Sequence, residues 1–536
     1  MNRLTGLFKH HNHGGGTRGT GKMQDPSPGG SPFPSQSDLF RYRKQRGVNL
    51  GSWFVLERWI ADAPFRFAKE PAQSDLDVAR GSYAKEVLER HWDSWISEPD
   101  WEWIARRGIN TVRIPIGYYH LCGVDPTVIQ GTDFADHLRI FEGAWNRVTN
   151  ALTTASRYGL GVLIDLHAAP GKQNRDSHSG TSAKDPQFFT KTNMKHTTQV
   201  LITLLEQLTQ FAQSHNPPLS NLVGIELINE PQPDNNHPML ERWYVETSSA
   251  LRRINPHIPI YIGDSWMTDQ YAAFIERQSG DLPFFVLDHH LYRCFTESDA
   301  NTSVEQHIAH LSDPNSNTAQ ILRRVSQKLS AQSVGGALVI GEWSGALNPG
   351  SLQGIGNDIE ARRNFVGVQL TLYEEHCAGW YFWTYKKEHP GDKGWSLTDA
   401  VSAGVFPSVV GLRCNPEHLR YDQDRPSRKQ VAKDSAFGQH MAYWSQHPGN
   451  YEHWRFEHGF IVGWDDAWLF FESVAALPPH SPVPELGFKG PWLRRRLQQH
   501  VQDKGGGNGL WEFEHGFSQG LMAGYDDLQA KLGIRR

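Results

Sequence analysis

The sequence has few of the features that mark secreted, membrane or metal-binding proteins. It contains only four cysteines in 536 residues, and their spacing matches no metal-ligand pattern. Residues 1–47 include no apolar run of the length that a secretory signal needs, and no stretch approaches the ~20 apolar residues of a membrane-spanning helix. We therefore expect reduced thiols and a cytoplasmic location, with non-classical export to the cell surface as the alternative.

Charge and motif content exclude further classes of protein. The net charge is −5 at pH 7, which gives no electrostatic case for binding nucleic acid. No glycine-rich phosphate loop follows an apolar run, and the Gly-x-Ser-x-Gly elbow of serine hydrolases is missing. Aromatic residues, in contrast, are abundant, with 19 Trp and 16 Tyr. Their flat faces are what sugar rings stack on, although core filling accounts for most of them.

Eight apolar runs predict buried strands. They span residues 46–54, 111–116, 161–167, 222–228, 258–264, 284–292, 336–342 and 378–384. Helical patterns lie between them, as at 86–107, 138–158, 195–213 and 359–376. This alternation predicts an α/β fold, a (β/α)8 barrel with inserted loops. A doubly wound open sheet is the alternative, but no phosphate-binding loop supports it.

Both ends of the chain lie outside this alternation. Residues 1–38 are rich in Gly, Ser, Pro and His, so we expect a disordered tail in which His10, His11 and His13 could bind a metal weakly. We assign residues 39–448 to the barrel domain. Residues 449–536 are predicted to form a helical C-terminal extension that packs on the barrel.

The extension contains two unusual features. The segment Phe-Glu-His-Gly-Phe occurs twice, at 456–460 and 513–517. These helical pieces are expected to pack on the barrel or on each other, or to form a lid that limits access to the site. Arg494, Arg495 and Arg496 stand in a row, which indicates either a solvated helix face or a contact for phosphate or acidic lipid.

Two of the predicted strands lead into glutamates. One is followed by Asn229-Glu230-Pro231 and the other ends in Gly341-Glu342-Trp343. Proline cannot continue a central strand, so Glu230 is expected at the carboxyl rim, where parallel barrels carry their chemistry. Each glutamate alone is explained as a solvent-side residue at a strand end. The two together predict a pair of carboxyl groups for acid/base catalysis.

Other polar residues in the apolar runs have two interpretations each. Arg113 needs an anionic partner because an unpaired buried charge is costly, and a purely structural ion pair would satisfy it. His167 and His290 are either site residues or satisfied core histidines. Asp288-His289-His290 suggests a metal site, but no third ligand at plausible spacing supports one. We expect neither a metal nor a cofactor in the site.

Together these motifs resemble family 5 glycoside hydrolases, and within them the fungal exo-β-1,3-glucanases (glucan 1,3-β-glucosidases). The likeness runs from about residue 46 to about residue 407, and it fades in the extension. It rests on Arg-Gly-Val-Asn-Leu-Gly-Ser-Trp-Phe-Val-Leu-Glu (46–57), Asp-Leu-His-Ala-Ala-Pro-Gly-Lys-Gln-Asn (165–174), Asn-Glu-Pro, Asp-His-His-Leu-Tyr (288–292), Gly-Glu-Trp and Gly-Trp-Tyr-Phe-Trp-Thr-Tyr-Lys (379–386).

The resemblance implies an exo-acting retaining β-glucosidase that releases glucose from a β-glucoside or β-glucan oligosaccharide by double displacement. Glu230 resembles the family's acid/base and Glu342 its nucleophile. The supporting positions it implies are Arg113 and Tyr292 at the nucleophile, His167 and His290 around the sugar ring, Asn229 at the 2-hydroxyl, Glu57 and Trp395 at the terminal glucose, and Phe295 in an aromatic clamp. Transglycosylation and a non-catalytic glucan-binding protein are the alternatives.

One segment departs from the family pattern. Residues 173–180 are Gln-Asn-Arg-Asp-Ser-His-Ser-Gly, where the glucanases commonly have Gln-Asn-Gly-Phe-Asp-Asn-Ser-Gly. An aromatic residue and an aspartate of the leaving-group side are therefore missing. We expect a conventional glucose site with an altered leaving-group site. We also expect the two carboxyl groups ~5–5.5 Å apart, with Glu230 protonated and Glu342 ionised.

Overall fold

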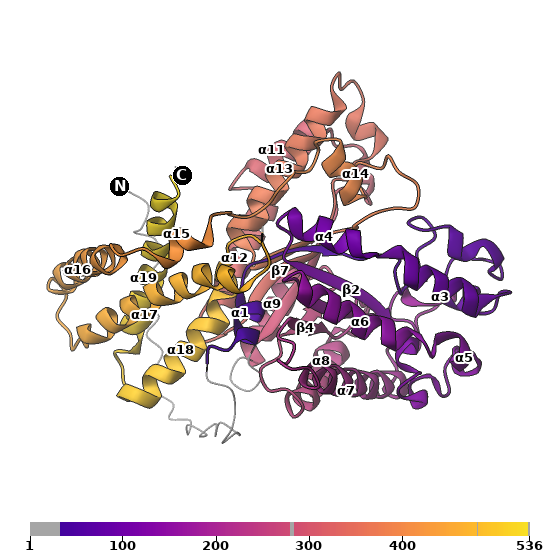
Figure 1. Ribbon diagram of the computed structural model, residues 1–536, viewed down its shortest axis with the longest axis horizontal. Coiled ribbons are helices and arrows are strands. Elements are labelled where there is room, and N and C mark those ends of the chain that lie inside the picture. The colour runs from indigo at the N-terminus through magenta and orange to yellow at the C-terminus, as the bar shows by residue number, and fades with distance from the viewer. Residues whose placement is uncertain (1–32, 279–283, 480, 534–536) are drawn as a thin grey trace. The chain divides into compact units, whose positions relative to one another are not determined.

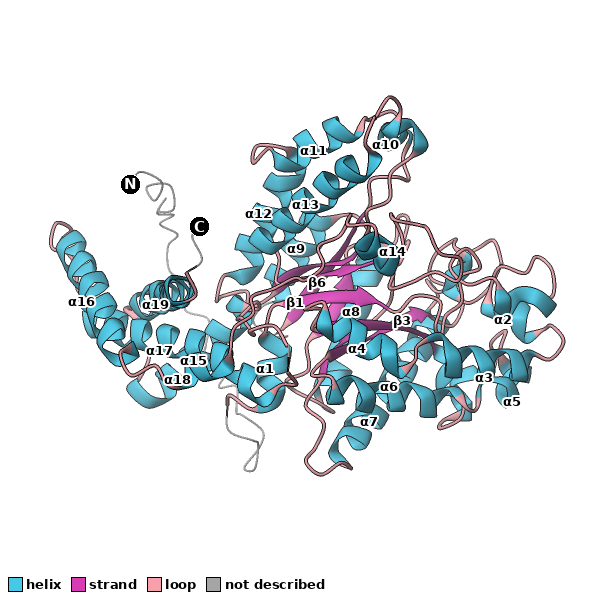
Figure 2. Cartoon of the chain, turned by 45° about the horizontal axis from the view of Figure 1, so that its top comes forward, coloured by secondary structure: helices cyan, strands magenta, loops and turns pink. Residues whose placement is uncertain are grey.

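A closed barrel of eight parallel strands forms the centre of the computed structural model, which describes residues 33–278, 284–479 and 481–533. The strands follow one another in chain order, and β1 pairs with β8 to close the barrel. Figure 2 shows them in magenta at the centre of the surrounding helices. They are β1 (Gln45–Asn49), β2 (Thr111–Gly117), β3 (Gly161–Ala168), β4 (Leu222–Glu226), β5 (Ile260–Gly263), β6 (Phe285–Leu291), β7 (Ala337–Trp343) and β8 (Gly379–Phe382). The predicted (β/α)8 fold is confirmed.

Helices surround the strands and fill the insertions between them (Figure 2). They are α2 (Asp75–Ala79), α3 (Ala84–Trp95), α4 (Glu98–Arg106), α5 (Leu138–Phe141), α6 (Ala144–Arg157), α7 (Lys191–Gln213), α8 (His237–Arg252), α9 (Thr268–Gln278), α10 (Glu297–Ala300), α11 (Val304–Ser312), α12 (Asn317–Ser330), α13 (Asp358–His376) and α14 (Leu397–Ser402). None of the described helices is long and apolar enough to cross a bilayer.

Two helices occupy the segment 86–107 that the sequence pattern predicted as one. Helix α3 ends at Trp95, and Ser97 caps α4, with its backbone N–H donating to the Asp100 carboxylate at 2.8 Å. Pro99 stands in the first turn of α4, where its missing N–H costs nothing. A capping residue followed by a first-turn proline therefore overrides the continuous apolar periodicity.

Five further helices, α15 (Pro416–Arg420), α16 (Arg425–Trp444), α17 (His453–Glu472), α18 (Lys489–Lys504) and α19 (Leu510–Lys531), make up the C-terminal part of the chain. Helices α16 to α19 lie together (Figure 1). α16 precedes the predicted boundary at 448, yet it packs against α17 and α19 of the extension. The division into domains remains a prediction.

The repeated Phe-Glu-His-Gly-Phe segments pack on each other. A Cβ atom at Gly459 of α17 would lie 2.1 Å from the Phe513 carbonyl oxygen, and one at Gly463 would lie 2.1 Å from the Phe517 carbonyl oxygen. The reciprocal contacts of Gly516 and Gly520 with the carbonyls of Phe456 and Phe460 are as close. Residue numbers increase in the same direction along both helices from one contact to the next, so α17 and α19 run parallel, with their backbones in contact. Only glycine permits this approach.

The extension docks at the amino-terminal end of the barrel. The Lys44 N–H donates to the Glu485 carbonyl at 2.6 Å, and the Gly487 N–H donates to the Tyr42 carbonyl at 2.9 Å. The Arg46 guanidinium also binds the Glu485 carboxylate at 2.8 Å. These contacts surround the start of β1, opposite to the carboxyl rim. The lid hypothesis is therefore wrong, because the extension sits at the far end of the barrel.

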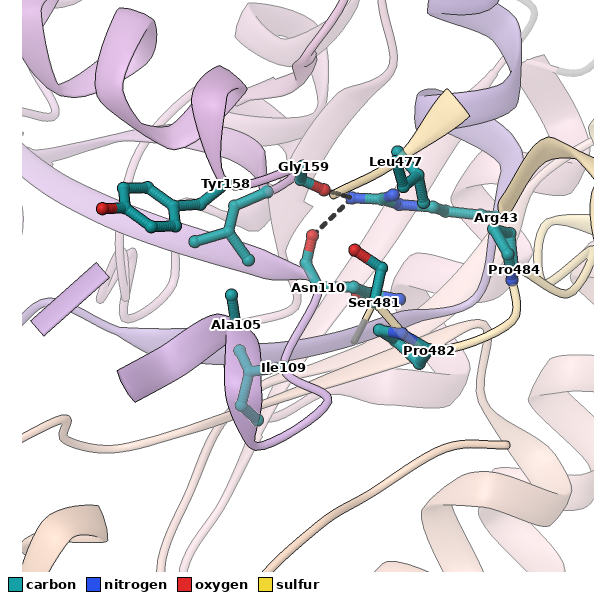
Figure 3. Close-up of a pocket in the computed structure, with 11 residues that line it drawn as sticks. Arg43, Ala105, Ile109, Asn110, Tyr158, Gly159, Leu477, Ser481, Pro482 and Pro484 are labelled. Atoms are coloured by element: carbon teal, nitrogen blue, oxygen red, sulfur yellow. Dashed lines mark hydrogen bonds between the residues drawn. The ribbon is translucent and has the colours of Figure 1, made fainter. Parts of the chain in front are cut away.

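A buried arginine fills the seam between barrel and extension (Figure 3). The Arg43 guanidinium donates to the carbonyls of Asn110 and Gly159, at 2.5 and 3.0 Å. Beside it lies a cavity of about 10 Å³, lined by barrel residues such as Ile109 and by Leu477 of the extension. Burial lowers the pKa of Arg43 to about 9. Carbonyl oxygens from two barrel loops thus hold a cation beneath the extension.

The arginine row on α18 points inward to specific partners. Arg494 donates to the Val334 carbonyl at 3.1 Å, Arg495 binds Asp38 at 2.9 Å, and the Arg496 Nε donates to Asp466 at 2.8 Å. The row is therefore neither a solvated face nor a phosphate contact. Asp38 lies on helix α1 (Gln36–Tyr42), which begins inside the stretch predicted as a disordered tail; residues 1–32 of that tail lie outside the described part.

Candidate active site

The two glutamates meet at the carboxyl rim of the barrel. Glu342 is the last residue but one of β7, and Glu230 lies in the loop that follows β4. One carboxylate oxygen of each is within 4.8 Å of the other. Glu230 has a φ of 43°, a left-handed conformation that a non-glycine residue adopts at a cost. Asn174 helps to hold it by donating to the Glu230 carbonyl at 3.1 Å.

Arg113 is the buried centre of the polar network beneath this pair. Its Nη1 donates to Glu342 Oε1 at 3.0 Å, and its Nη2 donates to Asn229 Oδ1 at 2.8 Å. Its Nε donates to Glu226 at 2.7 Å, and Nη2 lies 3.1 Å from Asp165. One guanidinium therefore orients the proposed nucleophile and the proposed 2-hydroxyl ligand at the same time. The anionic partner expected for Arg113 is in fact a set of three carboxylates.

The carboxyl group of Glu342 has three neighbours that favour its negative charge. Besides Arg113, the Tyr292 hydroxyl donates to Oε2 at 2.7 Å, and His290 Nδ1 lies 3.4 Å from the same oxygen. Burial raises the pKa of Glu342, and the charge of Glu230 raises it further, against the opposing effects of His290, Arg113 and Tyr292. The net direction is upward.

We expected the proton on Glu230, but the pKa shifts of the pair favour a proton on His290. The His290 Nδ1 is 2.7 Å from Glu230 Oε1. Burial alone would lower the pKa of His290, but the carboxylates of Glu342, Asp288 and Glu230 raise it well above its ordinary value. Burial likewise would raise the pKa of Glu230, yet the bond and charge of His290 lower it to about 2. In the site without substrate, these shifts therefore favour a protonated His290 beside an ionised Glu230.

Two further histidines, His167 and His178, lie near Glu230. The His167 Nδ1 pairs with Asp165 at 2.6 Å, which leaves its Nε2 at 3.4 Å from the Asn229 amide nitrogen. The rings of His167 and Trp383 stack at 5.7 Å. His178, from the segment that departs from the family pattern, places Nε2 3.8 Å from Glu230 Oε2. It stands on the side predicted to receive the leaving group.

Aromatic rings form the outer part of the site. Phe295 is 71% exposed and contacts Tyr292 and Trp395, with ring centroids 5.2 and 5.8 Å apart. Trp59 lies edge-on to Trp395 at 5.2 Å and donates its indole N–H to Glu57 at 2.8 Å. Burial and the nearby carboxylates raise the pKa of Glu57 to about 8. All ten predicted residues thus belong to one connected site, and their individual roles remain predictions.

Sequence reasoning missed several members of this network. Asp165 and Glu226 are register partners on β3 and β4, and both side chains are fully buried against Arg113. A carboxylate inside an otherwise apolar strand was the signal for each. In the Asp288-His289-His290 segment, alternation along the strand separates the two histidines, because His289 pairs with Asp264 at 2.7 Å while His290 faces Glu230.

Comparison with known proteins agrees with this arrangement. The model of the cellulase family (glycosyl hydrolase family 5) matches residues 87–389. The chain belongs to glycosyl hydrolase family 5. This family 5 enzyme is thus a glycoside hydrolase, and a second model, described as the glucan 1,3-beta-glucosidase 3 C-terminal domain, matches residues 425–527.

Relatives extend over most of this family 5 enzyme. Glucan 1,3-beta-glucosidase 3 of Schizosaccharomyces pombe is 30% identical over 494 residues, which cover 90% of this chain and 96% of the relative. An uncharacterized glycosyl hydrolase of Saccharomyces cerevisiae is 29% identical over 91% of this chain and 92% of its own length. The crystal structure of rutinosidase from Aspergillus niger shares the fold, with a TM-score of 0.52 and 20% identity over 69% of this chain and 99% of its own.

Proposed function

We propose that this family 5 enzyme is a retaining β-glucosidase that releases glucose from the non-reducing end of β-glucosides. Glu342 is the nucleophile and Glu230 the acid/base. The observation that supports this proposal is that one oxygen of the Glu230 carboxylate lies within 4.8 Å of one oxygen of the Glu342 carboxylate. Retaining glycosidases place them ~5–5.5 Å apart, whereas inverting enzymes leave ~6.5–9.5 Å for a water molecule.

In the first half-reaction, the Glu342 carboxylate attacks the anomeric carbon and the glycosidic oxygen departs. Glu230 donates a proton to that oxygen, and the proton reaches Glu230 Oε1 across the 2.7 Å hydrogen bond from His290. Arg113 and the Tyr292 hydroxyl hold Glu342 in line. Asn229, oriented by Arg113, bonds the 2-hydroxyl more strongly as the ring becomes oxocarbenium-like.

In the second half-reaction, Glu342 is esterified and carries no charge. The Glu230 carboxylate then takes a proton from water, the water oxygen attacks the anomeric carbon, and the bond to Glu342 breaks. Two inversions give net retention. Interception of the glycosyl-enzyme by a second sugar would give transglycosylation, which product analysis at high substrate concentration distinguishes from hydrolysis.

A nucleophile replacement tests the assignment. Glu342→Ala should lower turnover of an aryl β-glucoside by at least ~10⁴-fold, because the covalent intermediate cannot form. Added azide should restore turnover and yield the α-glucosyl azide, since a small anion then occupies the space of the carboxylate. Near-normal activity of Glu342→Ala, or a β-configured azide product, would show that the residue is not the nucleophile.

The leaving-group side directs the choice of substrate. The curated relatives named above include a glucan 1,3-beta-glucosidase, and β-1,3-glucan oligomers are therefore the first substrates to test. Asp176 stands where the family has an aromatic residue, and His178 Nε2 lies 3.8 Å from Glu230 Oε2. Because the leaving-group side is altered in this way, small or lipid-linked β-glucosides are the second class to test. Hydrolysis rates across laminari-, gentio- and cello-oligosaccharides, steryl glucosides and aryl glucosides will rank them. Oligosaccharide binding in a calorimeter without cleavage over a day would instead support a non-catalytic glucan-binding protein.

We also propose that the enzyme works in the cytoplasm. Its four cysteines are free thiols, two of them buried, as expected in a reducing compartment. Fractionation of cells that express a fluorescent fusion tests this location. Recovery of the intact fusion at the cell surface would favour the export alternative.

A further inference from the structure

Three side chains of the C-terminal helices direct ligand atoms at one point, away from the active site. His440 of α16 places Nε2 2.9 Å from Glu512 Oε2 of α19. His453 of α17 places Nδ1 2.8 Å from the same oxygen, and the two nitrogens are 3.0 Å apart. Each helix contributes one ligand atom to a nearly equilateral triangle.

The three groups are buried and fixed in orientation. The side chains of His440 and Glu512 are fully buried, and that of His453 is 22% exposed. His440 stacks on the Phe456 ring at 4.1 Å, and the second Glu512 oxygen accepts the Glu452 N–H at 2.6 Å. Outer contacts of this kind hold the ligands of metal sites in place.

The size of the triangle fits one face of an octahedron. Ligand atoms at about 2.1 Å from a metal are about 3.0 Å apart on an octahedral face and about 3.4 Å apart in a tetrahedron. The observed separations of 2.8 to 3.0 Å match the octahedral value. If both ring nitrogens carried a proton and donated to the same Glu512 oxygen, two N–H groups would crowd each other, because the nitrogens are only 3.0 Å apart. A metal ion in place of these protons removes that repulsion.

We propose that His440, His453 and Glu512 bind one divalent first-row transition metal ion in the C-terminal domain. The ligands are two imidazoles and one carboxylate, the set that suits Fe²⁺, Co²⁺, Ni²⁺ and Zn²⁺. This site is separate from glycoside cleavage, because the C-terminal domain docks at the end of the barrel opposite to the carboxyl rim.

A metal ion at this position would have a structural role. Helix α16 has His440 as its only buried residue. Besides ring contacts such as that of Trp444 with Trp511 at 4.8 Å, its attachments to the helix pair are partly exposed ion pairs, such as Lys429 with Asp465 and Arg428 with Asp527. Pairs of this kind contribute little each. An ion with one ligand from each helix would join α16 to α17 and α19.

The test uses the full chain with His10, His11 and His13 replaced by Ser, to remove weak binding by the tail. After treatment with a chelator, Co²⁺ should bind with a stoichiometry of one, produce visible d–d absorption, and raise the Tm by about 2 °C or more at saturation. His453→Gln should abolish the absorption and the Tm shift. His447→Gln removes an exposed histidine of the same region and should leave both unchanged.

The opposite results overturn the site. These are the lack of any Co²⁺, Ni²⁺ or Zn²⁺ binding below 100 µM, or Co²⁺ absorption that persists in His453→Gln. His453 is partly exposed, so this variant should fold. A circular dichroism spectrum identical to that of the parent establishes this before the titration, and Glu512→Gln provides an independent second variant. Turnover of an aryl β-glucoside should not change with metal removal.

Discussion

At the scale of single residues, two cations organise the acids of the active site. Arg113 bonds Asp165, Glu226 and Glu342 from one guanidinium, and His290 lies against Glu230. The acids cannot all be ionised in a dry site without these partners, because like charges at this distance raise each other's pKa. Protonation is therefore a property of the whole cluster.

Loss of the Tyr292 hydroxyl should affect catalysis and leave the fold intact. In Tyr292→Phe the ring still contacts Phe295 and Trp395, but the 2.7 Å bond to Glu342 disappears. A hydrogen bond to a charged group contributes about 1.5–3 kcal/mol, so kcat/KM for an aryl β-glucoside should fall by about 10- to 150-fold. An unchanged Tm with this loss separates the effect from unfolding; wild-type kcat/KM would refute the contact.

Replacement of His290 should move the basic limb of the pH–rate profile to lower pH. In the wild type, the proton of the His290–Glu230 pair is held by an imidazole whose pKa is raised well above its ordinary value, so activity persists until that proton leaves at high pH. In His290→Gln the proton rests on Glu230 alone, a carboxyl group that loses it at lower pH. The profile of kcat/KM measures this shift. A basic limb that stays in place would show that His290 does not hold the catalytic proton.

At the scale of elements, the parallel pair of α17 and α19 depends on glycine. A methyl group at Gly459 would meet the Phe513 carbonyl at 2.1 Å, where backbone atoms cannot yield as a flexible side chain would. The repeated Phe-Glu-His-Gly-Phe motif is thus the sequence signature of a close helix–helix contact.

Gly459→Ala should destabilise the protein by at least ~2 kcal/mol, because the two helices must separate. The matched control is Gly438→Ala on α16, where an added Cβ meets nothing within 4 Å. That substitution should be neutral or stabilise by about 0.5–1 kcal/mol, through the better helix propensity of alanine. Thermal unfolding followed by circular dichroism compares the two. Equal effects would disprove the contact.

At the scale of the whole molecule, the extension supports the barrel from the end opposite to the chemistry. Arg46 connects the two by binding Glu485 of the extension at 2.8 Å and Glu374 of α13 at 2.8 Å. The pair with Glu485 is largely buried, so its loss leaves a desolvated cation with one partner fewer.

Glu485→Gln should therefore lower stability by about 1–3 kcal/mol and leave kcat/KM within about twofold of wild type. Glu102→Gln serves as the control, since it breaks an exposed ion pair with Arg106 and should change the Tm hardly at all. Thermal unfolding and aryl β-glucoside kinetics measure both quantities. A fall in kcat/KM at a temperature where Glu485→Gln is fully folded would mean that the extension communicates with the site.

Most of the barrel was predictable because its signals are local. Each strand is an apolar run, and Asn229-Glu230 and Gly341-Glu342 stand at or after the carboxyl ends of two of them. Parallel strands have their carboxyl ends on one rim, so the two glutamates lie on the same rim. The break between α3 and α4 was missed, although Ser97 and Pro99 marked it, because apolar periodicity continues across it. Both signals are contained in the sequence, and the capping signal is the stronger one.

The protonation of the site could not be predicted from sequence. The pKa shifts favour His290 over Glu230 as the protonated group because Asp288 and Glu342 also lie near that imidazole, and this grouping exists only after the barrel closes. The contacts of Asp165 and Glu226 with Arg113 likewise exist only in the closed barrel. Charges interact through space, so their balance depends on distances between residues that are far apart in the chain.

The sequence by itself determined where the strands lie, the rim on which the two glutamates stand and the helical character of the C-terminal segments, because each follows from local residue pattern. Tertiary structure alone decided where the proton rests, which face of the barrel the extension covers and how His440, His453 and Glu512 converge. The physical reason is that burial, Coulomb interaction and contact between backbones depend on the separation of groups in space, which no local pattern encodes.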